Sequence, residues 1–436
     1  MREKLLCSAL LCAVLFLGTT YAQQPGSDSL TINEAIKNTL NNQPAITQAL
    51  EQINTIEAKI KEQKSSYYPN VEADLSYTNI GPTISLAFPG MGTFDFNTMN
   101  NYDMHLSAEQ VLYDFGKRDA AMDVIKSYKL SAEEKVNLIK SSLAYQTIQV
   151  FYTILFIEKS IDVKNEQIKT LNEHLDIAKK KVESGSSTDF DVLTTEVRVA
   201  SAQNELIDLK NALAKSKIYL RGLMGSQDNT KLNLAGSFNI NIPSIDEQEL
   251  INRAFTLRSE IKLAKENVNS AELSSRAAGL GDKPVIALGL NYGLKNGFFP
   301  NLDVLRGNWA AAVYANIPIF NGYRTDAQKE EAEAELKTST QDILVQERKI
   351  RVEVQSAVTD LQTSLDKLKT TEVQVKHATE AVSRAEVQYR DGVITNLDLI
   401  DAETALAEAK LLYLQVIYKN VVNKFALDKV VGEVVW

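Results

Sequence analysis

The sequence predicts a mainly α-helical chain of 436 residues in which one unit is written twice, with long coiled-coil helices joined to a few β-strands. Three observations predict this fold class. The same motifs recur about 207 residues apart, apolar residues keep a heptad spacing over unusually long stretches, and four segments of about ten residues alternate between polar and apolar side chains. Together they indicate helical rods with two strands in each copy.

The first residues, MREKLLCSALLCAVLFLGTTYAQQ, have the layout of a secretory signal peptide. A charged start precedes an apolar core and a small-residue site, so we expect cleavage after Ala22. The core is short for a spanning helix, and an uncleaved anchor is the alternative. Both cysteines, Cys7 and Cys12, lie in this segment. The mature chain therefore has no disulfide, and its stability must come from packing or assembly.

Glycine-centred motifs mark the repeat. Gly185 and Gly392 stand 207 residues apart, and at that offset Asp191 falls on Asp398 and Glu196 falls on Glu403. The stretches VLYDFGKRDA and IPIFNGYRTDA repeat at an offset of 206. We expect a signal peptide at 1–22, a first repeat at 23–225, an irregular equatorial connection at 226–245 and a second repeat at 246–436. A repeat this long indicates a duplicated domain half.

Each copy begins with a predicted helical arm, at about 30–66 and 246–282, followed by a proline and two short segments. The offset between copies changes by nine residues between Pro69 and Gly116, so the first copy holds an insertion at 81–102. The matching loop of the second copy, at about 295–308, is shorter. We expect both loops to lie at the same end of the molecule.

The segments at 70–79, 104–113, 285–294 and 309–318 read as β-strands because their apolar residues recur at every second position. Ten residues is the length of a tilted membrane-spanning strand, and aromatic residues (Tyr77, Tyr292, Trp309) lie near strand ends. Half-buried hairpins of a soluble protein have the same pattern. Four strands are too few to close a pore, so either they do not span or several chains share one barrel.

The long helices are the strongest periodic signal. From Gly116 to Gly185 a continuous helix would reach about 100 Å at 1.5 Å per residue. Apolar residues follow steps of three, four or seven along both copies, which is a heptad seam. The first seam runs through Leu143, Val150, Ile154, Ile157, Ile161, Ile168, Leu171, Leu175, Ala178 and Val182. Rods of this length need other rods to pack against.

Composition and motifs favour no catalytic function. We expect no catalytic residues, no metal site and no cofactor, because the chain has no zinc-protease, P-loop or nucleophile-elbow motif. The three histidines, His105, His174 and His377, are far apart, and we expect each at a solvated position. The net charge of −9 without basic clusters argues against nucleic acid as a partner.

The signal peptide, the doubled glycine–arginine helix starts and the doubled G-x5-D-[VL]-[LI] turns resemble the TolC family of outer-membrane efflux and secretion channels. The resemblance covers essentially the whole mature chain. It implies a homotrimer with one twelve-stranded barrel in outer-membrane lipid, four strands from each chain. It also implies a long periplasmic helical tunnel that meets a periplasmic adaptor and an inner-membrane pump or ATP-driven exporter.

The resemblance assigns roles to the two glycine turns. It implies that Asp398 and Asp401 form the acidic rings of a closed gate, and that Tyr389 and Asp191 belong to the polar network that holds the gate shut. It places Gly185, Thr188, Gly392 and Thr395 at the tip turns that contact the adaptor. A basic residue common in that network is replaced here by Ile394.

The same acids have a local explanation. Thr188 with Asp191, and Thr395 with Asp398, each read as a capping box that starts a helix. Asp191 and Asp398 therefore fit either a cap or a gate, whereas Asp401 lies one turn further along and is the better gate candidate.

Two classes of function remain open on the sequence. The first is a passive exit duct of a tripartite efflux or type I secretion system in a Gram-negative outer membrane. The second is a periplasmic coiled-coil protein, structural or adhesive, without a pore. The doubled pairs of alternating strands favour the duct, since a pure coiled coil has no need of them. In the duct, the loop at 81–102 is expected to face outside the cell.

Overall fold

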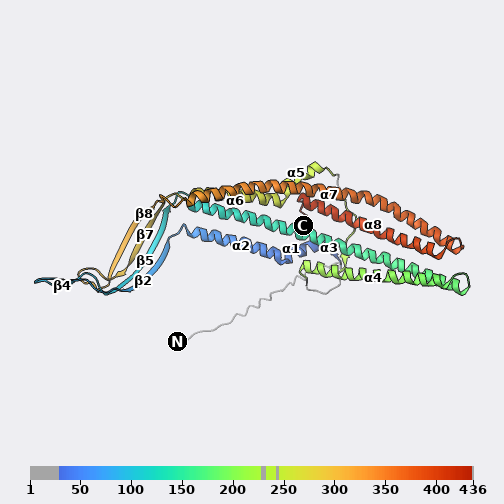
Figure 1. Cartoon of the computed structure of the whole chain (residues 1–436), viewed down its shortest axis with the longest axis horizontal. Coiled ribbons are helices and arrows are strands. Elements are labelled where there is room, and N and C mark those ends of the chain that lie inside the picture. The colour runs from blue at the N-terminus through green and yellow to red at the C-terminus, as the bar shows by residue number, and fades with distance from the viewer. Residues whose placement is uncertain (1–28, 227–231, 242–244, 435–436) are drawn as a thin grey trace, which may run out of the picture.

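The computed structural model describes residues 29–226, 232–241 and 245–434, so the predicted signal peptide lies outside the described residues. The molecule is elongated (Figure 1). The main strands lie at one end, and the turns α3–α4 and α7–α8 lie side by side at the other, which is called the tip below. The long helices run from the sheet to the tip.

Both halves of the chain have the same order of elements, which confirms the predicted mainly α fold with internal duplication. The two long helices have 67 residues each and the two return helices 36 each. The first half contains β1 (Leu30–Thr31), α1 (Ile32–Asn42), α2 (Pro44–Ser65), β2 (Asn70–Asn79), β5 (Asn100–Tyr113), α3 (Lys117–Glu183) and α4 (Asp189–Met224). The second contains β6 (Leu234–Ala235), α5 (Glu247–Leu257), α6 (Ser259–Gly279), β7 (Val285–Lys295), β8 (Arg306–Asn316), α7 (Arg324–Arg390) and α8 (Asn396–Val431).

Each predicted helical arm is broken in two, which the sequence reading missed. In the first half, Pro44 begins α2 and the preceding Gln43 is extended (φ −75°, ψ 120°), as the residue before a proline prefers. In the second half the break falls at Arg258, which has no proline after it. The Arg258 side chain is buried and pairs with Glu260 at 2.5 Å and with Glu353. The two breaks therefore have different causes.

Two further features differ from the expected outline. The insertion at 81–102 is not a plain loop, because it contains a small hairpin of β3 (Ser85–Phe88) and β4 (Gly92–Asp95). The range 226–245 was expected to be an irregular connection, but β6, which lies in that range and opens the second half, pairs in parallel with β1. This pairing ties the start of the first half to the start of the second.

The main sheet is antiparallel, in the order β2-β5-β7-β8, and its register gives it one apolar and one polar face. Residues that stand opposite each other across the four strands are mostly all apolar or all polar. Three rows of the apolar face are Val71, Ala108, Leu290, Ala311; Ala73, Leu106, Tyr292, Trp309; and Leu75, Met104, Leu294, Gly307. Two rows of the polar face are Asp74, His105, Gly293, Asn308 and Ser76, Asp103, Lys295, Arg306.

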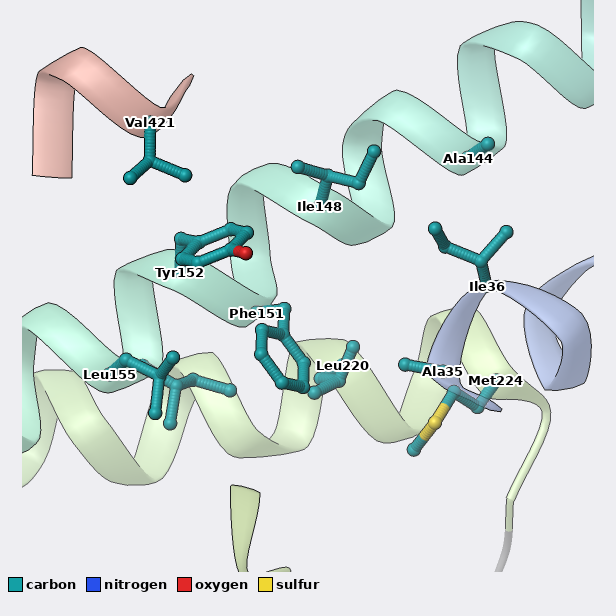
Figure 2. Packing of buried hydrophobic residues seen from close by; sticks show 11 residues of the cluster. Ala35, Ile36, Ala144, Ile148, Phe151, Tyr152, Leu155, Leu220, Met224 and Val421 are labelled. Atoms are coloured by element: carbon teal, nitrogen blue, oxygen red, sulfur yellow. The ribbon is translucent and has the colours of Figure 1, made fainter. Parts of the chain in front are cut away.

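The largest hydrophobic core surrounds the middle of α3 (Figure 2). Side chains of α3 meet α4 through Leu220 and Met224, α1 through Ile36, and α8 through Val421. Phe151 is fully buried at the centre of this cluster. The long helix is thus held by the arm, by its own return helix and by the return helix of the other half. Across the described residues, no helix is long and apolar enough to cross a membrane.

Candidate functional site

The tip consists of two glycine turns. Gly185 (φ 74°) follows α3 and Gly392 (φ 76°) follows α7, and both have the left-handed backbone that glycine adopts without strain. The amide after each glycine reaches back to the helix, from Ser186 to Lys181 O and from Val393 to Gln388 O, each at 2.8 Å. These bonds satisfy carbonyls that the helix end leaves free. The glycines therefore reverse the chain without loosening the helix ends.

The helices restart with capping boxes, as the sequence predicts. Thr395 donates its amide and its hydroxyl to the Asp398 carboxylate, at 2.9 and 2.6 Å, and these bonds lower the pKa of Asp398. The first turn is looser, since the Thr188 amide lies 3.4 Å from the Asp191 carboxylate. Ser187 donates to that same carboxylate at 2.5 Å. Both acids therefore do act as caps.

The second turn is anchored onto the first hairpin by Asn396, the first residue of α8. Its side-chain amide donates to Asp191 O at 3.2 Å and to the Thr195 hydroxyl at 3.3 Å. Its carbonyl oxygen lies 2.5 Å from Nε2 of His174 on α3. His174, expected to be solvated, is only 3 % exposed, and burial lowers the pKa of its imidazole. That expectation was wrong because the spacing of residues along α3 does not show that His174 faces Asn396 of α8.

Tyr389 lies beneath the same junction. Its ring is 5.0 Å from the His174 ring, and the Lys181 ammonium lies 3.7 Å from the ring centroid while donating to Tyr389 O at 3.0 Å. Among the described residues its buried hydroxyl has no hydrogen-bond partner. Burial and the nearby Asp191 charge raise the pKa of this phenol. The structure thus brings Tyr389 and Asp191 close together without a hydrogen bond between them.

The two acids assigned to a gate have different surroundings. Asp398 is part of its cap, while Asp401 pairs with Arg198 of α4 at 3.4 Å, with both side chains about half exposed. Ile394 stands where a basic residue was expected. It packs instead against a small cluster that contains Tyr389 and Leu399. This apolar contact lies within the second hairpin, so at this point it is the Arg198–Asp401 pair that links the two hairpins.

Several residues of this junction escaped the sequence reading. His174, Lys181, Thr195, Arg198 and Asn396 all connect the two hairpins, yet none belongs to a recognisable motif. The one available signal was the repeat itself, because Asn396 replaces Asp189 at the offset of 207. No group of three His, Cys, Asp or Glu side chains within the described ranges is arranged to hold a metal ion.

Comparison with known proteins identifies the fold. Residues 35–226 and 250–433 match the family model described as "Outer membrane efflux protein". The chain is 20 % identical to the outer membrane efflux protein BepC of Brucella suis, over 98 % of this chain and 90 % of that protein. It is 23 % identical to the cation efflux system protein CusC of Escherichia coli O157:H7, over 86 % and 81 % of the two chains.

The solved structure of the outer membrane protein VceC from Vibrio cholerae superposes with a TM-score of 0.77 at 18 % identity. The match covers 92 % of this chain and 96 % of VceC. The resemblance to the TolC family, the fold class and the outer-membrane location are thereby confirmed. Since the matched segments cover most of both halves, the chain belongs to the outer membrane efflux protein family.

Proposed function

We propose that three copies of this chain assemble into one outer-membrane exit duct, closed at the tip by the junction described above and opened together with a periplasmic adaptor. The duct would take its substrate from an inner-membrane pump or an ATP-driven exporter. The observation that carries this proposal is the two-faced sheet with unpaired edges.

The sheet is unfinished in a single chain. Its edge strands are β2 and β8, and the apolar face stays open, with Leu75 73 % and Trp309 77 % exposed. A half-buried hairpin of a soluble protein would cover such a face. Lipid on the apolar face and water on the polar face suit strands of this length, provided that the edges pair with other copies. Three copies of four strands give the twelve-stranded barrel.

The helices support the same assembly. α6 packs against both long helices, α3 and α7, whereas its counterpart α2 packs against α3. A neighbouring copy whose α7 lies beside α2 would repeat the contact that α6 makes within one chain. Repeated around a threefold axis, this contact closes a ring of long helices that encloses a tunnel.

The repeat also gives the register between copies. Val71–Ala108 in the first half corresponds to Ile286–Ala315 in the second. By the same correspondence, Leu106 of β5 matches Val313 of β8, and Tyr292 of β7 matches Tyr77 of β2. Since Leu106 and Tyr292 are paired within one chain, Val313 of one copy is expected opposite Tyr77 of the next. Cysteines introduced at these two positions would stand close enough for a disulfide. The natural mature sequence adds no competing thiol.

The test is cross-linking of the Tyr77→Cys, Val313→Cys double variant in membranes. We expect a covalent trimer on a non-reducing gel that returns to monomer on reduction. The control carries Tyr77→Cys and Ala312→Cys, since Ala312 points to the opposite face of the sheet. Failure of the first pair to link, or equal linking of both pairs, would contradict the proposed ring.

The alternative, a coiled coil without a pore, would need neither the apolar face nor the open edges. Reconstitution into planar bilayers separates the two. A duct gives stable unit conductances, whereas a coiled coil leaves the bilayer insulating.

A further inference from the structure

A buried acid lies close behind the tip and takes no part in the junction described above. Glu403 of α8 is 7 % exposed, and among the described residues its Oε2 atom has no hydrogen-bond partner. An unpaired carboxylate in such a place is costly, because no group compensates for the water it has lost. The position therefore needs a proton or another partner.

Glu403 lines a cavity of about 170 Å³ between three helices. α3 contributes Glu166 and Gln167 to the lining, α7 contributes Glu386, and α8 contributes Lys410 as well as Glu403 itself. Lys410 pairs with Glu166 at 3.0 Å, which largely neutralises those two charges. Burial of Glu403 opposes its ionisation, and the negative charge of Glu386, which has no such partner among the described lining residues, opposes it further. The two effects raise the pKa of Glu403 to about 7.

We propose that Glu403 is a proton-binding site in the helical wall, and that its protonation controls how firmly the tip half of α8 is held against α3 and α7. With the proton bound, the side chain is neutral and the three helices pack closely. Without it, a buried negative charge faces Glu386, and separation of the helices lets water reach the carboxylate. The consequence for the tunnel rests on the proposed function: protonation of Glu403 would favour the closed tip.

The duplication supplies a matched reference position. Glu196 stands at the equivalent place in the first half, yet it is exposed and pairs with Lys179 at 3.5 Å. In the first hairpin, Glu196 therefore has solvent and a lysine beside it. In the second hairpin, Glu403 is buried and has no lysine or arginine paired with it in the described part of the chain. Only the second hairpin carries the proton-binding site.

The direction of the pH effect follows from the two states. In the packed state the pKa is about 7, while a solvated glutamate has a value of 4.5. The packed state therefore binds more protons, so packing is strongest at acid pH and weakens as the pH rises toward 7. Between pH 6 and pH 8 the packing equilibrium should change by about tenfold.

His174 titrates in the opposite sense, because burial lowers its pKa. It lies at the junction and is unchanged in the variants of Glu403, Glu196 and Glu386. The difference between the wild type and a Glu403 variant therefore isolates the effect of Glu403.

The test is hydrogen exchange by mass spectrometry on the full mature chain in detergent, followed over residues 397–410 and corrected for the intrinsic pH dependence of exchange. Local exchange reports the opening equilibrium of a helix. We expect protection of this segment in the wild type to fall about tenfold between pH 6 and pH 8. E403Q, which mimics the protonated acid, should stay protected at both pH values, and E196Q should behave as the wild type.

E386Q provides an independent probe that leaves Glu403 in place. Without the Glu386 charge, the midpoint of the transition should move to lower pH. The proposal is overturned if the wild type and E403Q show the same pH dependence, or if E196Q abolishes it. Because exchange is measured without any current, a failure here is distinct from a failure to form a duct.

Discussion

Asp398 and Asp401 stand three residues apart on α8, and their contacts give them separate tasks. Asp398 accepts two hydrogen bonds from Thr395, so its charge is used to start the helix. Asp401 has Arg198 as a partner across the two hairpins. Of the two roles that the sequence left open for Asp398, the contacts described here account for the cap.

Loss of the cap should loosen the start of α8. We expect Asp398→Ala to lower the local stability of the first turn of α8, because the bonds that Thr395 donates to this carboxylate are lost. Hydrogen exchange over the first turn of α8 measures this. Asp401→Ala serves as the control, because Asp401 lies outside the box. Equal loss of protection in both variants would contradict a specific capping role.

Asp401→Ala should change conduction instead. In a threefold assembly this acid would occur three times around the axis, and such a ring selects cations and binds divalent ions. Its removal should weaken divalent block from the periplasmic side, reduce cation selectivity and release Arg198. Single-channel recording with and without a divalent cation checks this. Unchanged selectivity and block would leave Asp401 as a surface ion pair.

His174 should make the tip sensitive to acid. The docked state holds a neutral imidazole and binds fewer protons than the undocked one, so docking is complete well above the ordinary pKa of 6.5 and is lost as the pH falls through and below it. Exchange over residues 392–398 should therefore accelerate in acid in the wild type and less so in His174→Gln. His377→Gln is the control, because His377 is exposed.

At the scale of elements, close contact between β5 and β7 joins the two halves of the sheet. A Cβ at Gly293 would lie 2.1 Å from Met104 O and 2.5 Å from the His105 backbone. Both contacts involve backbone atoms, which cannot move aside as a flexible side chain could. The pairing of the halves thus depends on one glycine in β7.

Gly293→Ala should disrupt this pairing and with it the assembly. We expect a marked loss of protein that migrates as an oligomer on mild-detergent gels. Gly307→Ala on β8 is the matched control, since nothing lies within 4 Å of the added atom. If both variants assemble equally well, the β5–β7 contact is more adaptable than its geometry indicates.

Periodicity predicted the elements that are long or regular. The predicted strand at 70–79 coincides with β2, and the helix expected between Gly116 and Gly185 is α3. The break at Arg258 was missed because its buried ion pair with Glu353 depends on residues 95 positions apart. The break before Pro44 has a local signal, the proline itself, which the prediction of one continuous arm did not use. The junction around His174 was missed for the same reason as the break at Arg258. The spacing of residues along one helix does not reveal which side chains of another helix they contact.

At the scale of the whole molecule, the hairpin of β3 and β4 lies at the end opposite to the tip (Figure 1). In an outer-membrane duct that end faces outside the cell. An epitope inserted beside Met91, which is 74 % exposed, should therefore be labelled on intact cells. An epitope beside Val393 in the tip turn should be labelled only after the outer membrane is opened. The reverse pattern would contradict the proposed orientation.

The anchor of the tip belongs to one hairpin alone. Asn396 fastens the α7–α8 turn onto its neighbour, and the equivalent position of the α3–α4 turn holds Asp189. A duct made of three chains would therefore have six hairpins of two alternating kinds. The anchor would then occur at every second hairpin around the ring, so that breaking it would release three of the six turns from their neighbours.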